Sequence, residues 1–133
     1  MHADGTVSDC SHCSPADAAT AFVALRGLQM AERLVDESHF DLSIRRCPRC
    51  GATWLAIFTE LIDWNAGDDA QAWLCVRVSD DELGPLRAAS EDERERVLHG
   101  MNLSRRHLAW VHPRGNSESV SWKDGRLVIL PHD

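Results

Sequence analysis

The chain has 133 residues, 44% of them hydrophobic, and a formal net charge of −7 at pH 7. A chain of this length is typical of one domain, and it buries enough apolar surface to fold without disulfides. We therefore expect residues 1–133 to form a single domain. Because affinity for nucleic acids depends mainly on neutralising phosphates, the acidic charge argues against a DNA- or RNA-binding module.

The start of the chain, Met1–Thr6, lacks the basic residues and the apolar run of a signal peptide. The apolar stretches elsewhere are too short to span a bilayer. We therefore expect a cytoplasmic protein with no membrane association. In that reducing compartment, paired cysteines are more often metal ligands than disulfides. The five cysteines are also an odd number, which excludes a complete set of disulfides within one chain.

The first predicted element is a helix that follows the pair Cys10-Ser11-His12-Cys13. In the segment Ser14–Asp17, a serine can cap the helix, a proline suits its first position and an aspartate favours its positive end. Apolar residues then recur at helical spacing, namely Ala18, Ala21, Phe22, Leu25 and Leu28. A second apolar set at Ala31, Leu34 and Val35 either continues this helix or forms a separate turn.

Strands are predicted on both sides of the second pair, Cys47-Pro48-Arg49-Cys50-Gly51. Before it, Phe40, Leu42 and Ile44 alternate with polar residues, as in a half-buried strand. After it, residues 53–62 are aromatic and β-branched enough for a central strand. Residues 73–78 could pair back and complete a three-stranded meander, in which Cys75 is a small buried hydrophobe.

The loop between the second and third of these strands, residues 63–72, is acidic and flanked by Trp64 and Trp73. Its aspartates and asparagine suit the backbone of a turn. Exposed tryptophans in an acidic loop would form a protein-docking surface, whereas most tryptophans are largely buried. The sequence leaves open whether these two residues belong to the core or to an interface.

Residues 79–101 are predicted to be helical in pieces, with an interruption at Gly84-Pro85. A capping box at Ser90–Glu93 starts one piece and Gly100 ends it. The remaining chain returns to a strand pattern. Residues 107–111 predict one strand, and residues 120–123 and 126–130 predict a hairpin around Asp124-Gly125.

The two Cys-x-x-Cys pairs are the strongest chemical signal in the chain. Four thiolates in two such pairs are the ligand set of a structural zinc site, and we expect one Zn²⁺ per chain at Cys10, Cys13, Cys47 and Cys50. Four cysteines close the coordination shell, so the metal would be structural and not catalytic. His12 is a poorer ligand candidate because it lies between two better-placed sulfurs. A zinc/thiol redox switch is an alternative use of the same cysteines.

These residues resemble the zinc-ribbon class, in which two strands flank a Cys-x-x-Cys-Gly turn. Small bacterial proteins of uncharacterised function with this turn before an aromatic strand are similar. The resemblance implies an α+β fold: a zinc-ribbon-like antiparallel β-sheet, with an N-terminal helix inserted between the two Cys pairs. It would cover residues 10–78. Residues 79–133 would add a helical segment and a C-terminal β-hairpin.

Three functions are compatible with these features. The first is a non-enzymatic zinc protein that binds another protein, as an adaptor or immunity protein does, with a basic partner matching the acidic charge. The second is a nucleic-acid-associated regulator, which requires one basic patch built from Arg45, Arg46, Arg49, Arg105 and Arg106. The third is an enzyme, which requires a deep pocket lined by His39, His107 or His112. No motif assigns a catalytic residue.

Overall fold

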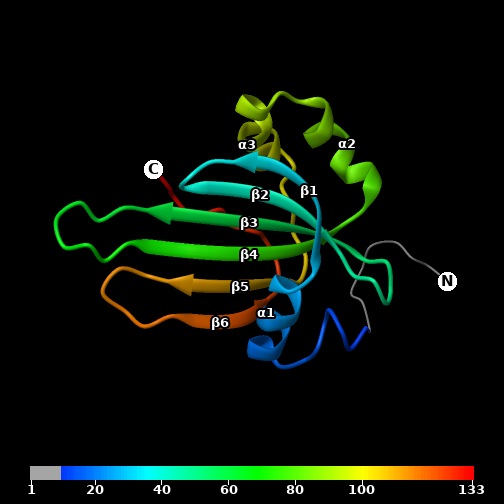
Figure 1. The fold of residues 1–133 in the computed structure, drawn as a ribbon, viewed down its shortest axis with the longest axis horizontal. Coiled ribbons are helices and arrows are strands. Elements are labelled where there is room, and N and C mark those ends of the chain that lie inside the picture. Colours follow the sequence, from blue (N-terminus) through cyan, green and yellow to red (C-terminus); the bar gives the residue numbers. More distant parts are fainter. Residues whose placement is uncertain (1–9) are drawn as a thin grey trace.

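A computed structural model describes residues 10–133 of the chain. They form a mixed α/β structure with one six-stranded antiparallel sheet, in which every strand pairs with the next strand along the chain (Figure 1). The strands are β1 (Gln29–Asp36), β2 (Phe40–Arg46), β3 (Thr53–Leu61), β4 (Ala70–Val78), β5 (His107–His112) and β6 (Ser119–Lys123). The helices are α1 (Ala18–Arg26), α2 (Asp80–Ala88) and α3 (Glu91–Gly100).

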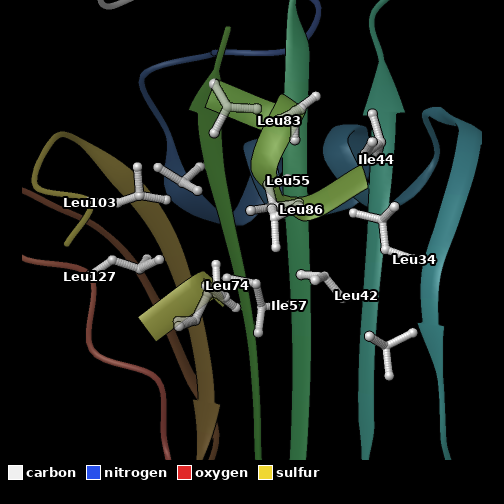
Figure 2. Packing of buried hydrophobic residues seen from close by; sticks show 14 of the residues in the cluster. Leu34, Leu42, Ile44, Leu55, Ile57, Leu74, Leu83, Leu86, Leu103 and Leu127 are labelled. Atoms are coloured by element: carbon white, nitrogen blue, oxygen red, sulfur yellow. The ribbon is translucent and has the colours of Figure 1, made fainter. Parts of the chain in front are cut away.

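Each face of the sheet carries its own apolar cluster. On one face, Leu42, Leu55 and Leu74 of the strands pack with Leu83 and Leu86 of α2 (Figure 2). On the other face, Ala21 and Leu25 of α1 pack with the opposite sides of the same strands. Because successive side chains of a strand point to opposite faces, coverage of both faces explains why β3 and β4 are buried almost continuously.

The predicted meander over residues 40–78 is confirmed, and its register follows from the alternation of side chains. Leu42 pairs with Ile57, and Ile57 pairs with Leu74, so an apolar row crosses β2, β3 and β4 on one face. The same sheet continues beyond residue 78 into β5 and β6. The predicted strand at residues 107–111 is β5, which pairs with β4.

The segment Ala31–Val35 lies in the edge strand β1 and not in a helix or turn. The preceding helix ends at Arg26, and the backbone NH of Gly27 bonds to carbonyls of the last turn. Leu34 and Val35 are both buried because a register shift in the β1–β2 pairing lies between Arg33 and Val35. The apolar spacing in this segment therefore reflects a bulged strand, whose side-chain alternation is broken.

The predicted start of the first helix is also wrong. The helix begins at Ala18, and its cap is Asp17, whose carboxylate accepts a hydrogen bond of 2.9 Å from the backbone NH of Thr20. Ser14 instead belongs to the turn after the first Cys pair, where its NH donates to the Cys10 carbonyl. Pro15 accepts a hydrogen bond from the Trp122 indole NH.

The helical region after β4 divides at a different place from the predicted one. Pro85 lies inside α2, and the chain breaks at Ala89 and Ser90, whose backbones are extended. The capping box is formed by Ser79 and Glu82, and Ser90 makes no side-chain cap. Helix α3 nevertheless ends at Gly100, as expected.

The predicted C-terminal hairpin is replaced by a different pairing. Strand β6 pairs with β5, and Gly125 adopts a φ of 94° at the following turn. Beyond it the chain runs beside residues 103–105, where the NH of Leu127 donates to the Leu103 carbonyl. Leu127 is buried with Leu103 in the cluster of α2 and α3, so burial of this side chain directs the segment across the sheet (Figure 2).

The C-terminal segment, residues 126–133, forms a strap over the face that also carries α2 and α3. It leaves the end of β6 and reaches the far side of the sheet (Figure 1). There the ring of His132 stacks on that of Phe40, with ring centroids 4.8 Å apart. The NH of Asp133 donates to the Glu60 carbonyl, and His132 hydrogen-bonds Glu95 of α3 at 2.6 Å. The strap thus continues from β6 and forms hydrogen bonds with both β3 and α3.

Candidate metal centre

The four predicted ligands are brought together in space. The sulfurs of Cys10, Cys13, Cys47 and Cys50 all lie within 4.8 Å of one another. The Cys10 and Cys47 sulfurs are 3.9 Å apart, and the Cys13 and Cys50 sulfurs are 3.7 Å apart. Cysteine sulfurs joined in a disulfide would be about 2 Å apart, so neither of these two pairs of sulfurs forms a disulfide. This arrangement is compatible with metal binding.

Both Cys pairs use the same local backbone geometry. The NH of Ser14 donates to the Cys10 carbonyl, and the NH of Gly51 donates to the Cys47 carbonyl, each at 2.9 Å. Gly51 has a φ of 76°, a conformation that glycine adopts without strain. A further bond from the Cys47 NH to the Ala52 carbonyl closes the turn between β2 and β3. The expectation of a tight turn at Gly51 is confirmed.

The chain positions the two pairs through different elements. The second pair is held by the antiparallel pairing of β2 and β3, which continues up to Arg46 and Thr53. The first pair is held against the sheet by the segment leading into α1, and α1 packs on β5 and β6. The 33 residues between the pairs form α1, β1 and β2. A cation bound by all four sulfurs would therefore link the N-terminal segment to the middle of the sheet.

Close packing of the thiols makes their joint ionisation costly without a cation. Burial and the neighbouring Cys50 thiol raise the pKa of Cys13 to about 12. Burial also raises the pKa of Cys50. At Cys10, burial opposes ionisation, but the backbone NH groups of Cys13 and His12 and the adjacent thiols lower its pKa to about 7. A bound metal ion would supply the positive charge that stabilises all four thiolates.

Trp54 provides an independent observation that the site suits thiolates. Its indole nitrogen is buried and has no hydrogen-bond partner in the described residues. The indole lies beside Cys13, where it lowers the pKa of that thiol. A thiol is a weak acceptor, whereas an ionised acceptor makes hydrogen bonds about twice as strong. The buried indole NH is therefore satisfied best when Cys13 is a metal-bound thiolate.

The sulfur spacing fits zinc. Tetrahedral coordination with Zn–S bonds of about 2.3 Å separates neighbouring sulfurs by about 3.8 Å, close to both of the separations above. The cluster contains no histidine, so His12 is not part of it. Cys75 is fully buried on β4, where burial raises its pKa, and it lies outside the cluster. The prediction that Cys75 is a buried hydrophobe is confirmed.

The five arginines required for a basic patch do not converge. Arg45 and Arg46 are consecutive strand residues and point to opposite faces; Arg45 lies over the Trp73 ring and Arg46 donates to the Thr53 hydroxyl. Arg105 donates two hydrogen bonds, of 2.8 and 2.6 Å, to the Glu82 carboxylate and lowers its pKa to about 2. The structure thus provides no single patch from this set.

Of the three histidines considered for an enzyme, His107 lines a cavity. Its Nδ1 lies 2.8 Å from the Arg105 carbonyl, so this nitrogen donates to main chain. His39 contacts Glu60 at 3.2 Å, and His112 lies 3.4 Å from the Asp69 carbonyl. The three rings occupy separate environments, and within residues 10–133 their hydrogen-bond partners are main-chain carbonyls and a carboxylate, not a hydroxyl or thiol nucleophile.

The two tryptophans that flank the acidic loop have opposite environments. Trp73 is 7% exposed and packs edge-on against Phe22 of α1, with ring centroids 5.6 Å apart. Trp64 is 82% exposed. The loop below it is ordered by hydrogen bonds, because Asp63 accepts from the NH groups of Asn65 and Ala66. The loop aspartates thus satisfy turn backbone, as expected.

The fold and the cysteine cluster define a mixed α/β protein with a six-stranded antiparallel sheet and a candidate metal centre at one end of it. Comparisons with protein-family models, with curated proteins and with solved structures each found no match to the chain. Membership of the zinc-ribbon class therefore stays a prediction from the cysteine pattern. None of the helices among residues 10–133 has the length and apolarity needed to cross a membrane.

Proposed function

We propose that the chain is a non-enzymatic protein that holds one structural Zn²⁺ through Cys10, Cys13, Cys47 and Cys50 and acts by binding another protein. The observation that carries the zinc assignment is the convergence of four cysteine sulfurs, which all lie within 4.8 Å of one another. Three features support a structural role: all four ligands are cysteines, two of them are buried, and the buried Trp54 NH supports one thiolate. A zinc-ribbon-like arrangement of the two Cys turns fits this role.

The surface best suited to a partner is the β3–β4 loop with Trp64 at its tip. Tryptophan is enriched among residues that dominate interface energies, and an exposed one on an ordered loop loses little entropy on binding. Arg114 of the β5–β6 loop stabilises this loop through an ion pair with Asp63, in which Nε of Arg114 lies 3.6 Å from Oδ2 of Asp63. The loop is acidic and the chain carries a net charge of −7, so we propose a basic partner, in an adaptor- or immunity-like role.

The zinc assignment is tested by native mass spectrometry of the purified protein and of its Cys10→Ser and Cys47→Ser variants. We expect one zinc per chain, and loss of that zinc in both variants. Cys75→Ser is the matched control, because Cys75 is a buried cysteine outside the cluster, and it should retain zinc. If the native protein holds no metal, the alternative of a thiol redox switch replaces the zinc assignment. The exposed Cys50 would then be the thiol that an oxidant meets first.

The partner surface is tested by affinity purification from the source cells at two salt concentrations, with Trp64→Ala as the variant. We expect a basic protein that is recovered with the native chain, lost with Trp64→Ala and weakened by salt. Val23→Ala is the control, since Val23 is 73% exposed on α1 and apolar, and it should leave recovery unchanged. Equal recovery with Trp64→Ala would contradict this surface.

A further inference from the structure

A cavity of about 220 Å³ lies between the C-terminal strap and strands β4–β6, on the sheet face away from the cysteine cluster. Leu74, Ala109 and Val111 form its inner wall, and Val128 and Leu130 of the strap form its outer wall. Leu74 and Ala109 are cross-strand partners, so they share one face. The small side chain of Ala109 leaves room at the centre of this wall.

The charges at the cavity are opposite in sign to the charge of the whole protein. The chain has 21 acidic and 14 basic residues, yet no aspartate or glutamate lines the cavity, whereas Lys123 and Arg126 do. Both residues are exposed, and neither side chain makes an ion pair with another residue in the described part of the chain. Lys123 is the single lysine of the protein. An anion at the mouth would meet two uncompensated cations.

His107 adds a fixed polar group to the same wall. It is 3% exposed and pairs with Lys123 across β5 and β6, so the two side chains lie on the same face. Its Nδ1 donates to the Arg105 carbonyl, which fixes the ring and leaves Nε2 as the nitrogen available to a ligand. An apolar cavity with a few convergent polar groups is the usual form of a small-molecule site.

We propose that this cavity binds a small amphipathic carboxylate, with the carboxylate at Lys123 and Arg126 and the apolar body against Leu74 and Ala109. Pockets for drug-sized ligands usually span roughly 300–1,000 Å³, so the smaller volume here selects a medium-chain or single-ring acid. The strap closes the outer side of the site, so ligand binding would stabilise its position. This site is independent of the proposed zinc ion and of the Trp64 loop, and it assigns the protein a ligand besides its partner.

The proposal is tested by titrating the zinc-loaded full chain with sodium octanoate and following backbone amides by NMR. We expect saturable shifts at the amides of Ala109, Val111 and Val128. Octan-1-ol has the same chain length without the charge. It should bind about tenfold more weakly, since the loss of a hydrogen bond to a charged group typically lowers affinity by about that factor. The Lys123→Gln/Arg126→Gln variant should weaken octanoate binding by at least about tenfold. Arg96→Gln, which removes an exposed cation on α3, should leave it unchanged.

A second measurement uses the single lysine. Octanoate should slow acetylation of Lys123 by acetic anhydride, read by mass spectrometry of the peptide that contains it, and the N-terminal amine serves as internal control. The proposal is overturned if octanoate gives no saturable shifts at the cavity amides, if octan-1-ol binds as tightly, or if the double variant binds as well as the native chain. Both substituted residues are exposed, so the double variant should fold. Amide NMR signals outside the strap that match those of the native chain would verify this.

Discussion

At the scale of single residues, one group that is not among the four cysteines lies beside the candidate metal centre. The Trp54 side chain lies on the same strand face as Ala56, pointing toward the cysteines, and its indole lies beside Cys13. Trp54 was expected only as a residue of a central strand, because the sequence gives no indication of an acceptor for its NH. Groups that hydrogen-bond to metal ligands typically change metal affinity by about 10- to 100-fold when mutated.

We therefore predict that Trp54→Phe weakens zinc binding by about tenfold, because it removes the NH and keeps an aromatic ring in the core. The measurement is competition for zinc with a chromophoric chelator at neutral pH. Trp64→Phe is the matched control, since it makes the same change at an exposed position, and it should bind zinc as the native chain does. Unchanged affinity in Trp54→Phe would show that the indole NH does not support the thiolate.

At the scale of elements, a single arginine joins α2, α3 and β1. Arg94 on α3 donates to the main-chain carbonyls of Leu86, Leu34 and Arg87 at 2.8, 2.8 and 3.1 Å. Two of these carbonyls lie near the C-terminal end of α2, where no intrahelical donor is available. The sequence pattern does not indicate these contacts, because helical spacing identifies neighbours on the same helix and not contacts between elements.

Arg94→Ala should lower the free energy of unfolding by about 2–3 kcal/mol, since it removes three charged hydrogen bonds and leaves partly buried carbonyls without donors. The measurement is urea denaturation of the zinc-loaded protein. Arg96→Ala tests the same substitution two residues along α3, where the guanidinium is exposed and forms an ion pair with Glu93. We expect a change within about 0.5 kcal/mol there. Equal effects of the two substitutions would refute the role of Arg94 as a link.

The elements that sequence reasoning misplaced share a physical cause. The Ala31–Val35 spacing is compatible with a helix, but the residues form a bulged edge strand because β2 offers them a pairing partner. The Asp124-Gly125 signal does mark a turn, but the chain after it is directed by burial of Leu127 against Leu103. Local patterns therefore identified where the chain changes direction. Contacts between segments far apart in the sequence decided which partner each segment has.

At the scale of the whole molecule, the sheet separates two apolar clusters that differ in the side chains that form them. The cluster under α2 and α3 consists of aliphatic and aromatic side chains alone, and the strap completes it. The cluster under α1 includes Cys13 and Cys47 of the candidate centre. Helix α1 is short, with nine residues, and it follows directly after the first Cys pair. The packing of α1 on the sheet should therefore depend on the metal more than the packing of α2 and α3 on the opposite face does.

We predict that chelation of zinc loosens residues 10–28 while the sheet persists. Hydrogen exchange should accelerate strongly in the amides of α1, and much less in β2, β3 and β4, because the opposite cluster still holds these strands together. Mass spectrometry of exchanged peptides measures both regions in one sample, and restoring zinc should restore protection. Uniform acceleration over the whole sheet would show instead that the two faces unfold as one unit.

The sequence by itself determined which four cysteines form a cluster compatible with metal binding, the strands around the second pair, the burial of Cys75 and the turn chemistry of the acidic loop. These are local properties, set by spacing, alternation and side-chain chemistry within a few residues. Only the tertiary structure decided that Trp64 is exposed while Trp73 is buried, that the Trp54 indole lies beside Cys13, and that Lys123 and Arg126 meet at one cavity. The reason is that each of these depends on contacts between segments far apart in the chain, which the packing of helices and the strap against the two faces of the sheet establishes.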